Sequence, residues 1–410
     1  MRRRRAALGA IAALALAIGV PAVARAQRPV PDTSGAIHVW EDQLPDSMST
    51  AQVRFIARHI DGTQKVSLLT ARRLRAYNPR FLVLHYRLGI GDGPVPFRIG
   101  ARWASDFATV TKHQSWFWHQ GGRRVLQTQY DWYLMNPDSG WSAYWARRVL
   151  YEARLLGDDG VFADSLSVPQ YLVPDSFSPP LQYFVGEQAW MARIDRFMRH
   201  ERRLLRGRLW FIPNAGSWIT TRDHTDYSLP DGVMIEGFAE ADASNFYAVG
   251  DWRLQMDRIL GLVRLGRVIL AQSYLNATDM TARGFVLASY LLVKGSHTFL
   301  NLDVGLEAQW FPEYGIDLGS ALGSPPRSID QLRQPNGLYE RRFQRGFVTV
   351  NPGARALSLR LAAPALLVRP LGGGALPSDA NVSGWGLRET PVSGSVTVPA
   401  HSGVVLLGSS

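Results

Sequence analysis

Along the chain, short apolar runs alternate with longer segments in which apolar residues recur at intervals of three and four. Short apolar runs bounded by turn residues are typical of strands, and the three-and-four spacing is typical of helices with one buried face. The runs predict eight strands, at residues 53–59, 81–86, 125–130, 160–164, 209–214, 233–236, 268–273 and 298–302. The segments between them predict helices that include residues 68–77, 144–156, 185–205, 252–265 and 281–293.

The order of these elements predicts an α/β fold. Strands separated by helices pair in parallel through right-handed crossovers, and eight such units within residues 51–335 have the size of a closed (β/α)8 TIM barrel. An open doubly wound sheet is the structural alternative, but it normally carries a glycine-rich phosphate turn after its first strand. Residues 61–65 follow the first predicted strand and read Asp-Gly-Thr-Gln-Lys, which does not fit that turn. We therefore expect the barrel.

A different pattern begins near Gly337. Short apolar runs are separated there by Gly and Pro turns, without a helical segment between them. These runs predict five strands, at residues 343–351, 356–361, 365–370, 394–398 and 403–407. We therefore expect a small antiparallel β-sandwich domain over residues 336–410 after the barrel, and an extended lead-in over residues 27–50 before it.

The first 26 residues have the three parts of a secretory signal peptide. Arg2 to Arg5 are basic, residues 6–20 are apolar, and Ala24-Arg25-Ala26 fits a cleavage site. The apolar run is short for a membrane span, so an uncleaved anchor is the weaker alternative. We expect an exported protein, periplasmic or extracellular, without stable membrane insertion after cleavage.

Charge and cysteine content exclude several classes of function. The formal net charge is +11, and removal of the five arginines in residues 1–26, which contain no acidic residue, lowers it to +6. This scattered surplus does not form the clustered basic face that nucleic-acid binding requires. The absence of Cys excludes disulfides, thiolate catalysis and cysteine metal sites. We expect a monomer without cofactors.

Two segments share one pattern. Residues 159–164 read Asp-Gly-Val-Phe-Ala-Asp and residues 231–236 read Asp-Gly-Val-Met-Ile-Glu, so each strand ends in a carboxylate. They are the predicted fourth and sixth strands. Catalytic groups of a TIM barrel lie at the C-terminal strand ends, and alternate strands supply the same inward layer. Asp164 and Glu236 are therefore predicted to point together into the barrel mouth.

A pair of carboxylates in one site fits the cleavage of glycosidic bonds. One protonates the leaving oxygen and the other attacks or stabilises the anomeric carbon, so the two need different pKa values. Ser165 beside Asp164 favours an ionised nucleophile, whereas the apolar neighbours of Glu236 favour a raised pKa and a general acid. Two interstrand steps together separate the two strands by about 9–10 Å. This separation allows either the retaining or the inverting distance between the two carboxyl groups.

The other predicted strand ends carry hydrogen-bonding and aromatic residues that suit a sugar ring. The candidate substrate-binding residues are Asp61, His85, Tyr86, Asp131, Trp132, Asn214, Gln272, Tyr274, Asn301 and Asp303. Asp131 and Asp303 are also the main alternatives for a catalytic role. The sequence contains neither an H-E-x-x-H metal motif nor a G-x-S-x-G nucleophile turn, so we predict no metal site and no serine nucleophile.

Several segments resemble a known family. Residues 58–65, the Leu84-His85-Tyr86-Arg87 segment and the strands that end in Asp164 and Glu236 resemble the bacterial hypothetical glycosyl hydrolases of the family 15-like set. The acid pair also resembles that of α-galactosidase-type barrels and of the family 114 endo-galactosaminidases. This second resemblance implies that Asp164 is the nucleophile and Glu236 the acid/base, with retention of configuration and an α-linked substrate.

The sequence therefore predicts a secreted glycoside hydrolase that acts on a poly- or oligosaccharide. Two alternatives stay open. One is a barrel that binds carbohydrate without cleaving it, and the other is a metal-dependent polysaccharide hydrolase or deacetylase.

Overall fold

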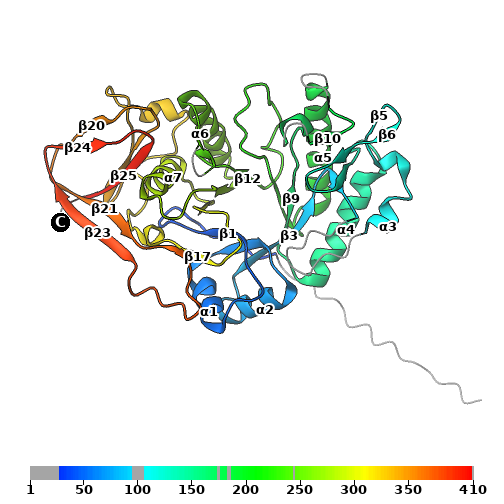
Figure 1. Ribbon diagram of the computed structural model, residues 1–410, viewed down its shortest axis with the longest axis horizontal. Helices are drawn as coiled ribbons and strands as arrows, with labels where there is room; N and C mark the ends of the chain where they lie inside the picture. Colours follow the sequence, from blue (N-terminus) through cyan, green and yellow to red (C-terminus); the bar gives the residue numbers. More distant parts are fainter. Residues whose placement is uncertain (1–26, 95–105, 173–175, 182–185, 243–244, 409–410) are drawn as a thin grey trace, which may run out of the picture.

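The computed structural model describes residues 27–94, 106–172, 176–181, 186–242 and 245–408. The predicted signal peptide, residues 1–26, lies outside these ranges. The fold is mixed α/β, as predicted. In Figure 1 the parallel strands lie near the centre, α1 and α2 lie below them, α4 and α5 lie on the right, and α6 and α7 lie on the left.

Eight parallel strands form two sheets. The five-stranded sheet has the order β1-β2-β3-β9-β11 and consists of β1 (Trp40–Gln43), β2 (Gly62–Lys65), β3 (Leu82–Leu88), β9 (Gly160–Asp164) and β11 (Trp210–Pro213). The three-stranded sheet consists of β12 (Gly232–Glu236), β15 (Val268–Gln272) and β16 (Thr298–Asn301). Isolated parallel bridges, Asn214 to Met234 and Val39 to Leu300, connect the two sheets at both edges. The C-terminal ends of all eight strands consequently lie on one side.

Two predicted strands are wrong. Residues 53–59 belong to helix α1 (Thr50–His59), in which Val53, Ile56 and Ala57 are buried at helical spacing and Ser49 and Gln52 form a capping box. Residues 125–130 contain only the two-residue strand β7 (Leu126–Gln127), which lies in a small antiparallel sheet. The other strands of this sheet are β4 (Gly91–Asp92), β8 (Trp132–Leu134) and β10 (Phe177–Ser178).

The true first and second strands, β1 and β2, lie in segments that we predicted as lead-in and turn. Two strands were therefore missed and two were wrongly assigned. The total of eight parallel strands is therefore the same as predicted. The strands that end in Asp164 and Glu236 are still the fourth and the sixth parallel strands along the chain.

All five predicted helices are present. They are α2 (Leu68–Tyr77), α4 (Gly140–Leu156), α5 (Glu187–Leu205), α6 (Val249–Arg264) and α7 (Met280–Val293). Helix α4 begins at the capping side chain of Ser139 and ends at Gly157, whose φ of 71° is left-handed. Short additional elements are α3 (Phe107–Val110), η1 (Gln114–Trp116), η2 (Pro169–Tyr171), η3 (Pro312–Gly315), η4 (Ile329–Leu332), β5 (His119–Gln120), β6 (Arg123–Arg124), β13 (Glu240–Asp242) and β14 (Asn245–Phe246).

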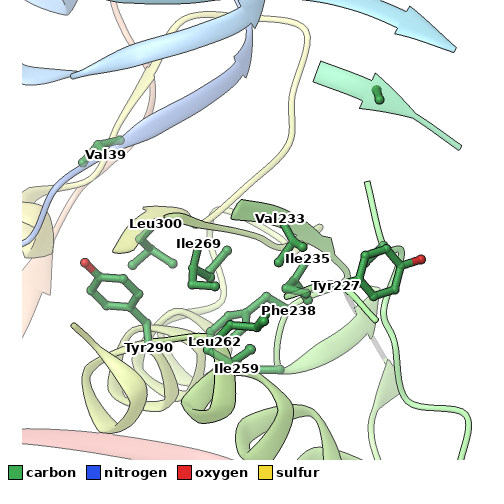
Figure 2. Close-up of a cluster of buried hydrophobic side chains, with 14 of the residues drawn as sticks. Val39, Tyr227, Val233, Ile235, Phe238, Ile259, Leu262, Ile269, Tyr290 and Leu300 are labelled. Carbon is green, nitrogen blue, oxygen red and sulfur yellow. The ribbon is translucent and has the colours of Figure 1, made fainter. Parts of the chain in front are cut away.

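Alternate residues of the parallel strands belong to two separate cores. The larger core lies between strands and helices, and Figure 2 shows part of it, with Val233 and Ile235 of β12 near Ile259 of α6. The smaller core contains the residues of the opposite strand face, including Tyr86, Phe162 and Met234. Because side chains alternate along a strand, Asp164 and Glu236 lie on the same face as this smaller core.

The C-terminal region is antiparallel, as predicted. Its main sheet has the order β18-β19-β25-β21-β23, formed by β18 (Tyr339–Phe343), β19 (Gly346–Asn351), β25 (Ser402–Gly408), β21 (Ala365–Leu371) and β23 (Gly386–Val392). Two-stranded sheets pair β20 (Leu357–Arg360) with β24 (Ser395–Val398), and β17 (Gln309–Trp310) with β22 (Gly374–Ala375). Helix α7 packs on β25 at two glycines, where a Cβ on Gly284 would lie 2.9 Å from the carbonyl oxygen of Gly403. The described residues include no helix that is long and apolar enough to span a membrane.

Candidate active site

Asp164 and Glu236 are the last residues of β9 and β12. Asp164 follows Phe162 by two residues and Glu236 follows Met234 by two, and both of these apolar residues belong to the smaller core. The two carboxylates therefore lie above that core, on the side where all the parallel strands end. Both are partly exposed.

Asn214 connects the two carboxylates. It directly follows β11, the strand between β9 and β12, and it is buried. Its side-chain Nδ2 donates to Asp164 Oδ1 at 2.9 Å and also donates to Glu236 Oε2. Two oxygens that accept from one nitrogen are at most about 6 Å apart, twice the length of a hydrogen bond. The two acids therefore share one small site.

Asp164 accepts two more hydrogen bonds. The hydroxyl of Tyr86, on β3, donates to Oδ2, and the backbone N–H of Ser165 donates to Oδ1 at 2.8 Å. Ser165 has a left-handed φ of 53°. The sequence led us to expect that the Ser165 hydroxyl would interact with Asp164, whereas the observed donor is the backbone amide.

Glu236 accepts a hydrogen bond from the hydroxyl of Tyr274, which follows β15. Burial raises the pKa of Glu236, and the negative charge of Asp164 raises it further, whereas the hydrogen bonds from Tyr274 and Asn214 act in the opposite direction. Burial also raises the pKa of Tyr274, so its hydroxyl is a donor at neutral pH. Glu236 therefore retains its proton to a higher pH than an ordinary glutamate does.

Two further predicted residues lie on the next two strands of the sheet, Gln272 at the end of β15 and Asn301 at the end of β16, and Asp303 follows β16 by two residues. Strand register aligns Glu236 with Gln272 of β15, and Gln272 with Asn301 of β16, so all three face the same side. Gln272 is fully buried, and neither of its amide atoms has a partner among the described residues; the Nδ2 atom of Asn301 is likewise unpaired there. Asp303 accepts from Gln309 at 2.9 Å, and burial raises its pKa.

Four predicted residues are not brought to the carboxylates. Asp61 lies before β2, at the opposite strand end, and binds His38 at 3.0 Å. His85 alternates with Tyr86 and therefore faces α4, where its Nε2 lies 2.9 Å from Glu152. Asp131 is exposed in the turn before β8, and Trp132 is buried in the larger core. The prediction for the last two depended on a parallel strand over residues 125–130, which the structure does not contain.

Lys65 and Asp42 lie at the site and were missed. Lys65 ends β2 and donates from Nζ to Asp42 Oδ2 at 2.7 Å, and Asp42 lies on β1. Burial lowers the pKa of Lys65, but the charges of Asp42 and Asp164 outweigh that effect and raise it. The ammonium group is therefore charged. Their position at or near the ends of strands could have identified both residues, because polar residues at strand ends form the site. From the sequence, β1 and β2 were not recognised as strands.

The comparison with protein families identifies the chain. The model described as hypothetical glycosyl hydrolase family 15 matches residues 75–347, more than half of the 410 residues. The chain belongs to this family. The range that matches hypothetical glycosyl hydrolase family 15 begins in α2 and ends in β19, so it includes Asp164, Asn214 and Glu236. It does not include Asp42 or Lys65.

Solved structures that are similar to this chain include three proteins. The cycloisomaltooligosaccharide glucanotransferase of Paenibacillus sp. is 11% identical with a TM-score of 0.40; the match covers 92% of this chain and 56% of that one. Ega3 of Aspergillus fumigatus, complexed with galactosamine, is 13% identical with a TM-score of 0.37, and the coverages are 60% and 80%. Amy13B of Eubacterium rectale is 10% identical with a TM-score of 0.46, and the coverages are 94% and 98%. No curated protein matches the chain.

Proposed function

We propose that this protein is a secreted glycoside hydrolase that cleaves O-glycosidic bonds of a poly- or oligosaccharide with Asp164 and Glu236. The observation that carries the proposal is the single side-chain amide of Asn214, which donates to both carboxylates. The two bridges that connect the sheets at both edges support a closed (β/α)8 barrel. The site lies at the C-terminal strand ends, where such barrels carry their chemistry.

The two acids have different surroundings and therefore different roles. Glu236, with its raised pKa, is the general acid that protonates the leaving oxygen as the glycosidic bond breaks. Asp164 attacks the anomeric carbon and forms a glycosyl ester. Glu236, now ionised, takes a proton from water, and the resulting attack on the anomeric carbon releases Asp164. A separation of no more than about 6 Å between the acceptor oxygens supports this retaining course. The family resemblance supports an α-linked substrate.

Gln272 and Asn301 lie in register with Glu236 and are fully buried. They therefore belong to the floor of the proposed site and not to the surface that a sugar ring would contact. Residues 1–26 support export to the periplasm or the extracellular space.

The decisive experiment is a glycan panel that contains α-linked glucans, galactans and amino-sugar polysaccharides, scored for released oligosaccharides. The first-formed product is then examined by proton NMR for its anomeric configuration. We expect cleavage with retention. Inversion would overturn the assignment of Asp164 as the nucleophile, and binding without cleavage would favour the carbohydrate-binding alternative.

Site variants test the two acids directly. Asp164→Asn and Glu236→Gln are each expected to lower kcat/KM at least about 1,000-fold, because each removes one of the two chemical groups. The exposed Glu389→Gln in β23 is the matched control and should retain wild-type activity. If a chelator abolished cleavage and the two site variants did not, the metal-dependent alternative would replace the proposal.

A further inference from the structure

Lys65 is a partly buried cation with unused hydrogen-bonding capacity. Its side chain is 14% exposed and that of Asp42 is 3% exposed. An ammonium group carries three N–H donors, and the described residues provide one hydrogen-bond acceptor, Asp42. Lysine is rare in this arginine-rich chain and occurs only at positions 65, 112 and 294. The site therefore uses a compact point charge where most other positions use a guanidinium group.

The structure holds this charge in place from several sides. The second carboxylate oxygen of Asp42 accepts from Gln64 Nε2 at 2.5 Å, and Gln64 itself accepts from the indole N–H of Trp40. The Nζ atom lies 5.1 Å from the ring centroid of Tyr86 and 5.8 Å from that of Phe162. These distances fit cation–π contacts. The position of the ammonium group is therefore fixed by β1, β3 and β9.

The groups that face this cation are mostly acidic. Titratable and charged side chains approach it from four strands; they are Asp42 from β1, Tyr86 from β3, Asp164 from β9 and Glu236 from β12. Tyr274, which follows β15, donates to Glu236. Both tyrosines have raised pKa values because of burial and neighbouring carboxylates, so they are neutral donors. The three carboxyl groups thus share one cation.

We propose that Lys65, held by Asp42, is a positioning residue whose charge faces both carboxyl groups and sets the pH at which Glu236 gives up its proton. The proposal rests on the proposed function of the two acids. It assigns a role to residues that precede the range matched by the family model. Asp42 neutralises part of the ammonium charge, so the pair gives a smaller field than a free lysine would.

The sign of the effect follows from electrostatics. A positive charge within a few ångströms of a carboxyl group stabilises its ionised form, by one to three pKa units. Loss of the Lys65 charge should therefore raise the pKa of Glu236. Glu236 must be protonated to act as the general acid, so the alkaline limb of a bell-shaped kcat/KM profile should move to higher pH by about one unit.

The test reads the carboxyl groups themselves and needs no substrate. The protein is labelled with carboxyl-¹³C glutamate and titrated by NMR, and the Glu236 signal is identified by its loss in Glu236→Gln. In Lys65→Met the pKa of Glu236 is expected to rise by about one unit. Lys65→Arg restores the charge and should keep the wild-type value. Lys112→Met, at an exposed position, is the matched surface control and should also titrate like the wild type.

A second variant protects the test against misfolding. Asp42→Asn removes a negative charge and leaves the ammonium, so the pKa of Glu236 should fall, opposite to Lys65→Met. An unchanged titration in a folded Lys65→Met, or the same direction of shift in both variants, would overturn the proposal. If the pKa of Glu236 shifts in Lys65→Met but the wild-type protein cleaves no glycan, the role of Lys65 in the charge balance is supported and only the proposed hydrolysis is rejected. Once a substrate is known, unshifted limbs with a raised KM would assign Lys65 to substrate binding instead.

Discussion

Two charged clusters lie on opposite faces of β3, and each contains a glutamate. On the inner face, Tyr86 donates a hydrogen bond to Asp164, which shares the donor Asn214 with Glu236. On the outer face, His85 and Arg87 contact Glu152 of α4, which also binds Arg148 at 2.5 Å. Burial acts on both glutamates in the same direction, yet the pKa of Glu236 is raised and that of Glu152 is lowered.

The difference lies in the balance of charge around each acid. Burial raises the pKa of Glu152, but the hydrogen bond from His85 and the charges of Arg87, His85 and Arg148 outweigh it. Glu236 instead faces another carboxylate, and a single lysine is shared among three acids. A buried acid with more than one cation partner stabilises the fold, whereas a buried acid beside a second acid is available for proton transfer.

The largest difference between the two clusters should appear when each glutamate is neutralised. Glu152→Gln removes one acid of the outer cluster, while Arg87 keeps Asp106 and His85 keeps Asp158, and we expect the free energy of unfolding to fall by about 2 kcal/mol at neutral pH. Because the pKa of Glu152 is lowered in the folded state, the stabilising effect should disappear as the pH falls below the ordinary value of 4.5. Urea denaturation at several pH values measures it. Activity per folded molecule should stay within about twofold of the wild type.

The next prediction concerns Asn214, the donor that Asp164 and Glu236 of the inner cluster share. Asn214→Ala removes one hydrogen bond from each carboxylate, and we expect kcat to fall about 100-fold with a smaller change in KM. The pKa of Glu236 should rise, because the hydrogen bond from Asn214 lowers it. Steady-state kinetics and carboxyl titration check both effects. Asn381→Ala, at an exposed position, is the control, and an equal loss of activity there would remove the special role of Asn214.

The smallest expected effect is on the free energy of unfolding in Glu236→Gln, and its sign is opposite to that of the effect at Glu152. The folded-state pKa of Glu236 is raised, so its ionisation costs stability at higher pH. Glu236→Gln should therefore increase the free energy of unfolding by about 1 kcal/mol above the raised pKa. The gain should shrink as the pH falls and vanish below the ordinary value of 4.5. A loss of stability in this variant would show that Glu236 is paired structurally, like Glu152.

The sequence predicts the parallel strands from β9 to β16 well because they consist of apolar runs, whereas β18 and β23 of the C-terminal sheet were not predicted. The inner and outer faces of β9 and β12 are both apolar until the terminal acid, and the pattern of Asp164 and Glu236 is readable for that reason. Strands β1 and β2 read Trp-Glu-Asp-Gln and Gly-Thr-Gln-Lys. The polar residues of these strands are buried and bind one another. A hydropathy pattern cannot distinguish such a polar strand from a loop.

Site residues were predicted where their strands were predicted, and were missed where their strands were missed. Tyr86, Asn214 and Tyr274 follow from correctly placed strands and contact the acids. His85 is one residue from Tyr86, and alternation of the strand face sends it to α4. Asp42 and Lys65 could not be predicted, because their pairing depends on the parallel contact between β1 and β2, in which Gln43 aligns with Lys65.

The most direct test of the account is the capture of the sugar on Asp164. The protein is incubated with a panel of fluorinated glycosyl fluorides, which slow the release of a covalent intermediate, and is then digested and analysed by peptide mass spectrometry. The account predicts one added sugar on the peptide that contains Asp164 and none on that peptide in Asp164→Asn. A sugar attached to another residue, with Asp164 unmodified, would contradict it.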